Sequence, residues 1–335
     1  MPLWDSLADL QVRVDDYALE RRELSTGGGW TRVTTTVVLR GDGWSGEGED
    51  VTYVAPDHDR FPAELMLAGT WTLAELSERL DQLELWSSEP EQAAGIDYRR
   101  WAFESAALDL ALRQSGQSLA AAVGREYRPV RFVVSTRSEI EPYLALDPAL
   151  EFKLDVEAAW HRATMEHLAS TDRVRVVDLK AYYRGTSVDL APDPEQYRSV
   201  VECLPGVVIE DPWLDDGCRE ALAGAEDRLS FDAPIHSLAD LDALPLEPRW
   251  LNIKPSRFGT VRGLAECLDA CAERGITMYG GGQFELGPGR RQIQRLASLF
   301  YADGPNDVAP SEYNEGGARP GLATSPLPPP EGEGF

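Results

Sequence analysis

Carboxylates recur at the ends of short apolar runs in the second half of this 335-residue chain. Asp178 closes the run "VRVVD", Glu210 closes "GVVIE", and Asp232 follows "LSF". Lys254 lies in "LNIKP", and the intervals between positions 178, 210, 232 and 254 each correspond to about one strand–helix unit. Carboxylates that meet at one level of a sheet repel one another, and a hard divalent cation removes that cost. The sequence therefore predicts a Mg²⁺ site formed by Asp178, Glu210 and Asp232.

A lysine lies one predicted strand beyond the third carboxylate. Near a bound dication and away from water, the pKa of Lys254 would be lowered, so this lysine could take a proton. The cation would hold a substrate carboxylate and stabilise the negative charge that appears when its α-proton leaves. Asn252 and Gln283 fall on the same side by strand alternation and are either substrate contacts or ordinary strand-end polar residues. Lys153 and Glu285 are further strand-end candidates for substrate binding.

Two neighbouring runs carry a lysine and an aspartate in opposite order. The run "EFKLDV" offers Lys153 and then Asp155, whereas "VVDLKAYY" offers Asp178 and then Lys180. Adjacent strands lie ~4.8 Å apart, so Asp155 and Lys180 could meet side by side. Two interpretations remain open: the pair handles a proton, or it forms only a structural ion pair.

Seven short apolar runs, most of them separated by helical segments, position these residues. They are "VRFVVST", "EFKLDV", "VRVVDLKAYY", "GVVIEDP", "LSFDAPI", "WLNIKP" and "ITMYGGGQFE". Strand–helix alternation indicates parallel βαβ units, and seven such strands favour an α/β fold of the (β/α) barrel type over an open sheet. We expect an α+β domain over 1–125, the barrel over 126–305, a return segment over 306–320, and a Pro- and Gly-rich disordered tail over 321–335.

The composition excludes several classes of protein. A net charge of -25 with no basic stripe argues against binding to nucleic acid or anionic membranes. No apolar run approaches the ~18 residues of a membrane span, and no signal peptide is evident. The four cysteines form no disulfide framework, which fits a reducing compartment. We therefore expect a cytoplasmic protein.

Several passages resemble the enolase superfamily, in its muconate-lactonizing and o-succinylbenzoate-synthase-like branch (the mandelate racemase/muconate lactonizing enzyme family). They are "WAFESAALDLALRQSGQSLAAAVG", "VVIEDP", "FDAPIHSLADL", "LNIKPSRFG", "GGGQFELGPGR" and "PNDVAPSEYN". Their order and spacing carry the likeness, which spans roughly residues 10–314. The resemblance implies a capping domain over a modified TIM barrel, (β/α)7β, with Mg²⁺ on Asp178, Glu210 and Asp232.

The resemblance also implies an activity. The common step of the family is abstraction of a proton α to a carboxylate, giving an enediolate, in isomerases and lyases that act on small carboxylates and often form homo-oligomers. Lys254 would be one of two lysines that face each other across the substrate. The loop "STGGGW" matches the capping-domain loop that closes on substrate, so Trp30 is either a specificity residue or a tryptophan at a sheet edge.

Two departures from the family pattern lie at the site. The second strand of the family reads Lys-x-Lys, but here it reads Lys153-Leu154-Asp155; the third reads Asp-x-Asn, but here Asp178-Leu179-Lys180. We predict that Asp155 and Lys180 share the acid/base work with Lys254 in a cycloisomerase, dehydratase or epimerase. The alternative is a catalytically impaired homologue that binds a metal ion and carboxylates.

Overall fold

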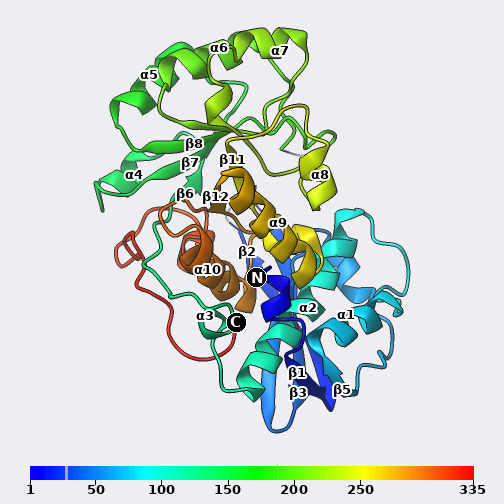
Figure 1. Ribbon diagram of the computed structural model, residues 1–335. Coiled ribbons are helices and arrows are strands. Elements are labelled where there is room, and N and C mark those ends of the chain that lie inside the picture. Colours follow the sequence, from blue (N-terminus) through cyan, green and yellow to red (C-terminus); the bar gives the residue numbers. More distant parts are fainter. Residues whose placement is uncertain (27–28, 187) are drawn as a thin grey trace.

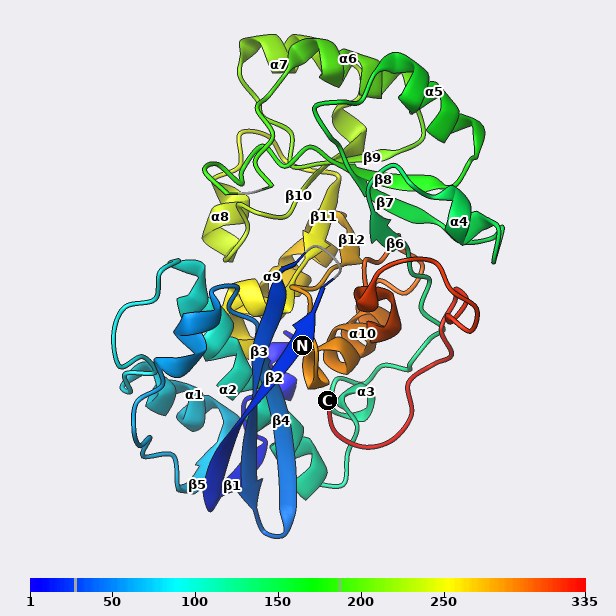
Figure 2. The ribbon, with the colours of Figure 1, turned by 180° about the vertical axis from the view of Figure 1, so that it is seen from behind.

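The computed structural model describes residues 1–26, 29–186 and 188–335. The N-terminal elements and the first strand–helix units of the second half occupy opposite ends of the molecule, and α9 (Val261–Arg274) and α10 (Pro288–Phe300) lie between them (Figures 1 and 2). At one end lie the blue and cyan strands and helices, and at the other lie the green helices α5 (Arg162–Ser170), α6 (Pro194–Cys203) and α7 (Asp216–Ala221).

The N-terminal region is built on antiparallel strands. Three of them form a sheet in the order β2-β3-β4, and the other two form the pair β1-β5. Their bounds are β1 (Gln11–Val14), β2 (Asp16–Ser25), β3 (Thr31–Gly41), β4 (Trp44–Asp50) and β5 (Gly69–Thr72). A hairpin at "GDG" joins β3 to β4, with positive φ at Asp42 (50°) and Gly43 (79°), as a two-residue type I′ turn requires.

The helices of the N-terminal region are α1 (Leu73–Asp81), α2 (Ala94–Gln114) and α3 (Leu119–Ala122). Helix α2 packs on β3 and β4, and α1 packs on β5 and α2. Helix α1 begins with a capping box formed by Thr72 and Glu75. Helix α2 lies directly on β4, because Gly46 and Gly48 have no side chain: a Cβ at Gly48 would stand 2.0 Å from the carbonyl oxygen of Ala102.

The rest of the chain forms one curled sheet of seven parallel strands in the order β12-β11-β10-β9-β8-β7-β6. The strands are β6 (Val134–Thr136), β7 (Phe152–Asp155), β8 (Val174–Asp178), β9 (Val208–Glu210), β10 (Leu229–Phe231), β11 (Trp250–Ile253) and β12 (Thr277–Gly280). Each lies within one of the seven predicted runs, so the expected parallel sheet is confirmed. The remaining helices are α4 (Glu141–Leu144), α8 (Leu238–Asp242), α9 (Val261–Arg274) and α10 (Pro288–Phe300).

A short return of the chain joins the two edges of this sheet. Asn306 bridges in parallel to Phe132 beside the first strand, and Asp307 bridges in parallel to Gly281 beyond the last strand. The amide of Asp307 donates to the carbonyl of Gly280 over 2.8 Å. The seven strands and this segment therefore give the barrel-like (β/α)7β arrangement.

The C-terminal tail packs against both halves of the molecule. Leu327 bridges to Val130 ahead of the barrel, and Arg295 of α10 donates to the carbonyl oxygens of Glu331 and Glu333. Phe335 is fully buried. The disorder predicted for 321–335 is therefore wrong: the irregular backbone that proline and glycine impose is held by contacts distant in sequence.

Among the described residues, none of the helices combines the length and the apolar character needed to cross a lipid bilayer.

Candidate active site

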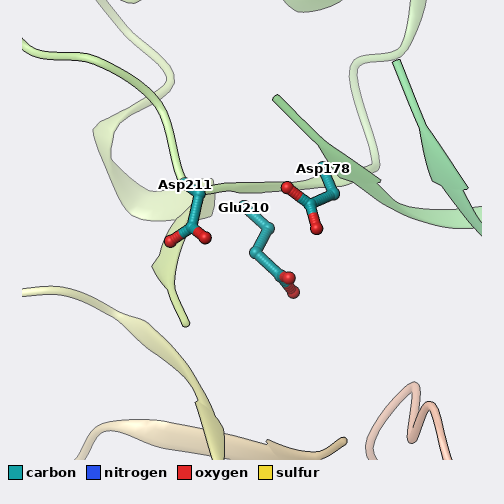
Figure 3. A group of neighbouring side chains, drawn as sticks. All are labelled: Asp178, Glu210 and Asp211. Carbon is teal, nitrogen blue, oxygen red and sulfur yellow. The ribbon is translucent and has the colours of Figure 1, made fainter. Parts of the chain in front are cut away.

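Three buried carboxyl groups gather at the carboxyl ends of two adjacent strands. Asp178 ends β8, Glu210 ends β9, and Asp211 follows directly. Asp178 and Glu210 are register partners, so both side chains leave the sheet at one level. One carboxylate oxygen from each residue lies within 4.8 Å of the others (Figure 3). This is a donor set that could hold a divalent cation.

Asp211 was not among the residues predicted from the sequence. Strand alternation places it on the face opposite Glu210, but its positive φ of 51° takes it out of that alternation. Its carboxylate accepts the backbone N–H groups of Asp232 (2.8 Å) and Ala233 (3.0 Å). Burial, and then the neighbouring carboxylates of Asp232 and Asp178, raise the pKa of Asp211 well above its usual value. The paired acids in "VIEDP" were the only signal for it.

The third predicted ligand, Asp232, follows β10 and is fully buried. Its Oδ2 lies 2.8 Å from Lys254 Nζ, and its Oδ1 lies 3.2 Å from Arg257 Nε. Burial raises the pKa of Asp232, but Arg257 and Lys254 outweigh burial, so the pKa lies below its usual range. Oδ1 accepts no hydrogen bond from the described residues. Asp232 as a metal ligand stays a prediction.

Lys153 supplies a buried counter-charge. Its ammonium donates to Glu210 Oε1 and lies 3.6 Å from Asp178 and 3.9 Å from Asp307. Burial lowers the pKa of Lys153, but the carboxylates of Glu210 and Asp178 overcome this and hold it well above the usual value. The ammonium thus faces protein carboxylates in this structure, and its predicted contact with a substrate stays a prediction.

Lys180 meets the aspartate on the neighbouring strand. Its ammonium lies 3.1 Å from Asp155 Oδ1 and 2.5 Å from Asp178 Oδ2, and these two aspartates are register partners on β7 and β8. Lys180 has a left-handed φ of 53°, which costs on the order of 1 kcal/mol for a residue other than glycine. The expected contact with Asp155 is confirmed. Its function, proton transfer or ion pair, stays a prediction.

Asn252 and Tyr279 fix the side chain of Glu210 by hydrogen bonds. Asn252 Nδ2 donates to Glu210 Oε2 over 3.1 Å, and the hydroxyl of Tyr279 donates to the same oxygen. Asn252 Oδ1 is buried and has no hydrogen-bond partner among the described residues. Burial raises the pKa of Glu210 to about 7, and the carboxylates of Asp178 and Asp232 add to the effect of burial.

The charges of this site do not balance within the chain. Its carboxyl groups are those of Asp155, Asp178, Glu210, Asp211, Asp232 and Asp307, and its cations are Lys153, Lys180, Lys254 and Arg257. When all are ionised, six negative charges face four positive ones, which leaves two negative charges. Burial, and after it the neighbouring carboxylates, raise the pKa values of Glu210 and Asp211. One divalent cation would neutralise it, so the residues fit such an ion.

The last two predicted polar residues lie on the loop after β12 and face the N-terminal region. Gln283 donates to the hydroxyl of Tyr98 and accepts from the hydroxyl of Tyr53, both over 3.1 Å. Glu285 accepts the backbone N–H of Gln283 and lies 3.2 Å from Arg290. The structure therefore places Glu285 against its own loop and α10. A substrate contact for either residue stays a prediction.

Trp30 lies where the N-terminal region meets this loop. Its ring centroid is 5.8 Å from that of Phe284 and 6.4 Å from that of Tyr53, and 42% of the residue is exposed. Arg32 fixes the contact, because its fully buried guanidinium donates to the carbonyls of Gln283 (2.7 Å) and Phe284 (3.1 Å). Gly27 and Gly28 of the predicted closing loop "STGGGW" lie outside the described residues.

The chain is similar to known proteins in sequence and in fold. The chain is 28% identical over 317 residues to N-succinylamino acid racemase from Amycolatopsis sp. The aligned region covers 89% of this chain and 80% of the racemase. It is 24% identical over 296 residues to o-succinylbenzoate synthase from Geobacillus stearothermophilus, and this alignment covers 82% of this chain and 76% of the synthase. The solved structure of muconate cycloisomerase from Pseudomonas fluorescens superposes with a TM-score of 0.67 at 19% identity, over 89% of this chain and 87% of that one.

The fold and these similarities define a divergent member of the enolase superfamily, in its mandelate racemase/muconate lactonizing enzyme branch. Within it, the chain belongs to the family described as "Domain of unknown function (DUF8230)", whose N-terminal domain matches residues 5–122 and whose C-terminal domain matches residues 126–315.

Proposed function

We propose that this protein is a Mg²⁺-dependent isomerase or lyase that removes a proton α to the carboxylate of a small acid. The observation that carries the proposal is the surplus of two negative charges among the carboxylates of the site, four of which are fully buried, with Lys254 and the Lys180–Asp155 pair beside these four. A buried surplus of this kind is costly for folding unless a cation or a substrate makes use of it.

The cation would be held by Asp178, Glu210 and Asp232. Asp232 is the third ligand in this proposal because its buried Oδ1 accepts no hydrogen bond, whereas both oxygens of Asp211 accept backbone N–H groups. Asp211 then positions Asp232 by holding its amide. When bound, the cation supplies electrostatic stabilisation of the negative charge that forms on the substrate carboxylate.

Lys254 is the base in this proposal. Its Nζ lies 2.8 Å from Asp232, at the carboxyl end of β11, where barrel enzymes place their chemistry. Nζ of Lys254 would take the α-proton, and the carboxylate of Asp232 would stabilise the resulting ammonium. Asn252 holds Glu210 in place over 3.1 Å, so it acts on the substrate only through that carboxylate.

Lys180 and Asp155 divide the second acid/base role. Asp178 and Asp155 keep the ammonium of Lys180 charged, because together they outweigh the burial that lowers its pKa. We therefore assign Lys180 as a cation or proton donor, and Asp155, whose side chain is one-third exposed, as the group open to a substrate. Trp30 and Gln283 would select the substrate from the side of the N-terminal region.

A second candidate function rests on one observation. Asp155 stands where the family pattern has its second catalytic lysine, so the chain could bind a metal ion and a carboxylate without turnover. The names of the relatives guide a test that separates the two functions: N-succinylamino acids, o-succinylbenzoate precursors, dipeptides and acid sugars are incubated with protein and Mg²⁺ in D₂O. The enzyme exchanges the α-proton of at least one of these acids. Cation binding without exchange in any of them supports the binding protein.

A further inference from the structure

We propose that Lys180 is an internal competitor for the cation, and that Asp155 is the second partner to which its ammonium retreats when the cation binds. The inference rests on the proposed cation site. It adds a specific property, that loading the site moves one positive charge from Asp178 to Asp155.

The geometry provides both positions. The ammonium of Lys180 lies 2.5 Å from Asp178 Oδ2 and 3.1 Å from Asp155 Oδ1, and the two aspartates are register partners on adjacent strands. A lysine side chain has four rotatable bonds, so its ammonium can leave one oxygen and keep the other without a change in the backbone.

A second cation on Asp178 makes this movement necessary. A dication held by Asp178 would stand within a few ångströms of the ammonium, in a site where Asp178 and Glu210 are fully buried and screening is weak. Like charges at such a distance repel strongly, so the ammonium must withdraw or the cation binds poorly. Asp155 is the only other carboxylate within 4.0 Å of the ammonium among the described residues.

Two buried oxygen atoms indicate that the site is built for a ligand. Asn252 Oδ1 has no hydrogen-bond partner among the described residues, and Asp232 Oδ1 has only the ion pair with Arg257 Nε at 3.2 Å, although both residues are at least nine-tenths buried. A buried acceptor without a hydrogen bond is costly, and a bound cation with its water ligands would satisfy both oxygen atoms.

The withdrawal has a consequence for the mouth of the site. The side chain of Asp155 is 33% exposed and that of Asp178 is fully buried, so the movement carries the ammonium outward. Cation loading would thereby present a positive charge where a substrate anion arrives. Without a bound cation, the ammonium would stay beside Asp178, inside the site.

Binding of Mn²⁺, followed by its electron paramagnetic resonance signal, tests this without any turnover. Lys180→Asn is the informative variant, because asparagine tolerates the left-handed backbone at this position. Removing the competitor should tighten Mn²⁺ binding by about tenfold or more. Asp155→Asn should weaken binding, because the ammonium then has only Asp178. When Asp155→Asn is added to Lys180→Asn, it should not change Mn²⁺ binding any further, because Asp155 acts only through Lys180.

Arg184→Gln is the matched control. Arg184 lies in the same loop, is exposed and stacks on Trp213 at 4.0 Å, so the variant removes one positive charge that no site carboxylate contacts. It should leave the Kd for Mn²⁺ within about twofold. Circular dichroism of each variant verifies that it is folded.

The outcomes separate this inference from the proposed function. Equal or weaker Mn²⁺ binding by Lys180→Asn, while the wild-type protein binds the ion, overturns the competition and leaves the metal site standing. An undiminished effect of Asp155→Asn in the Lys180→Asn background overturns the role of Asp155 as the second partner. Absence of Mn²⁺ binding in the wild-type protein and in every folded variant overturns both the inference and the proposed cation site.

Discussion

The ammonium of Lys180 lies 3.1 Å from the carboxylate of Asp155, so the two residues that depart from the family pattern are in direct contact. The contact crosses from β7 to the chain just after β8, and it joins the site through Asp178. Because the two departures are partners, we treat them as one rearrangement of the acid/base half of the site.

This pair gives a prediction for activity. Lys180→Ala should lower the rate of α-proton exchange by about tenfold or more, because the positive charge beside the substrate carboxylate is lost. The exchange rate is measured by proton NMR in D₂O at saturating Mg²⁺, so that a change in cation affinity does not contribute. Arg184→Ala is the control for removal of a positive charge from the same loop, and an unchanged rate in Lys180→Ala would refute the assigned role.

Substitutions of Asp232 and Asp211 test which of these two aspartates binds the cation. Asp232→Asn should weaken Mn²⁺ binding more than Asp211→Asn does, since Asp211 is already occupied by the amides of residues 232 and 233. Calorimetric titration with Mn²⁺ gives both dissociation constants. A larger loss in Asp211→Asn would instead make Asp178, Glu210 and Asp211 the ligand set.

The packed tail predicts a loss of stability. Phe335 is fully buried against Trp101, with ring centroids 6.2 Å apart, so Phe335→Ala should lower the free energy of unfolding by about 3 kcal/mol. Unfolding in urea measures the change. Glu331→Ala, which alters an exposed side chain of the same tail, should stay within about 0.5 kcal/mol of the wild-type protein. Equal stability of the two variants would contradict the packing of the tail.

His58 predicts how stability depends on pH. Its Nδ1 lies 2.9 Å from Thr35 Oγ1 and its Nε2 lies 2.9 Å from the carbonyl of Thr52, and burial lowers its pKa below the ordinary value of 6.5. Above pH 6.5 the side chain is neutral in both states. As the pH falls below 6.5, the unfolded chain binds a proton that the folded chain does not, so the free energy of unfolding decreases.

The measurement compares urea unfolding at pH 7.5 and pH 5.5, values we choose on either side of about 6.5. Between these two pH values, the free energy of unfolding should fall less in His58→Gln than in the wild-type protein, because the other ionisable groups contribute equally in the two proteins. The same loss in both proteins would show that His58 does not contribute.

The barrel and most of its acids could be predicted from the sequence, for local reasons. Parallel strands buried on both faces give continuous apolar runs, and an acid that closes such a run points to the carboxyl end of the sheet. Asp178, Glu210 and Asp232 were found in this way. Asp211 was missed because its position depends on a positive φ, which the sequence does not reveal for an aspartate.

The tail was mispredicted for a different reason. Its proline and glycine content is typical of disordered chain, but Arg295, Trp101 and Asp109 hold it from distant parts of the sequence. The partners of Lys180 could be anticipated only in part. Strand spacing predicted Asp155, whereas the contact with Asp178 depends on the left-handed backbone of the lysine itself.

The most direct test of the proposed function is deuterium incorporation at the α-carbon of a small acid, with the wild-type protein and Lys254→Ala compared at saturating Mg²⁺. Lys254 Nζ lies 2.8 Å from Asp232, so the alanine variant removes the proposed base. We predict exchange by the wild-type protein and a loss of at least about 100-fold in the variant. Equal exchange by the two folded proteins would contradict the assignment of Lys254 as the base and, with it, the central claim.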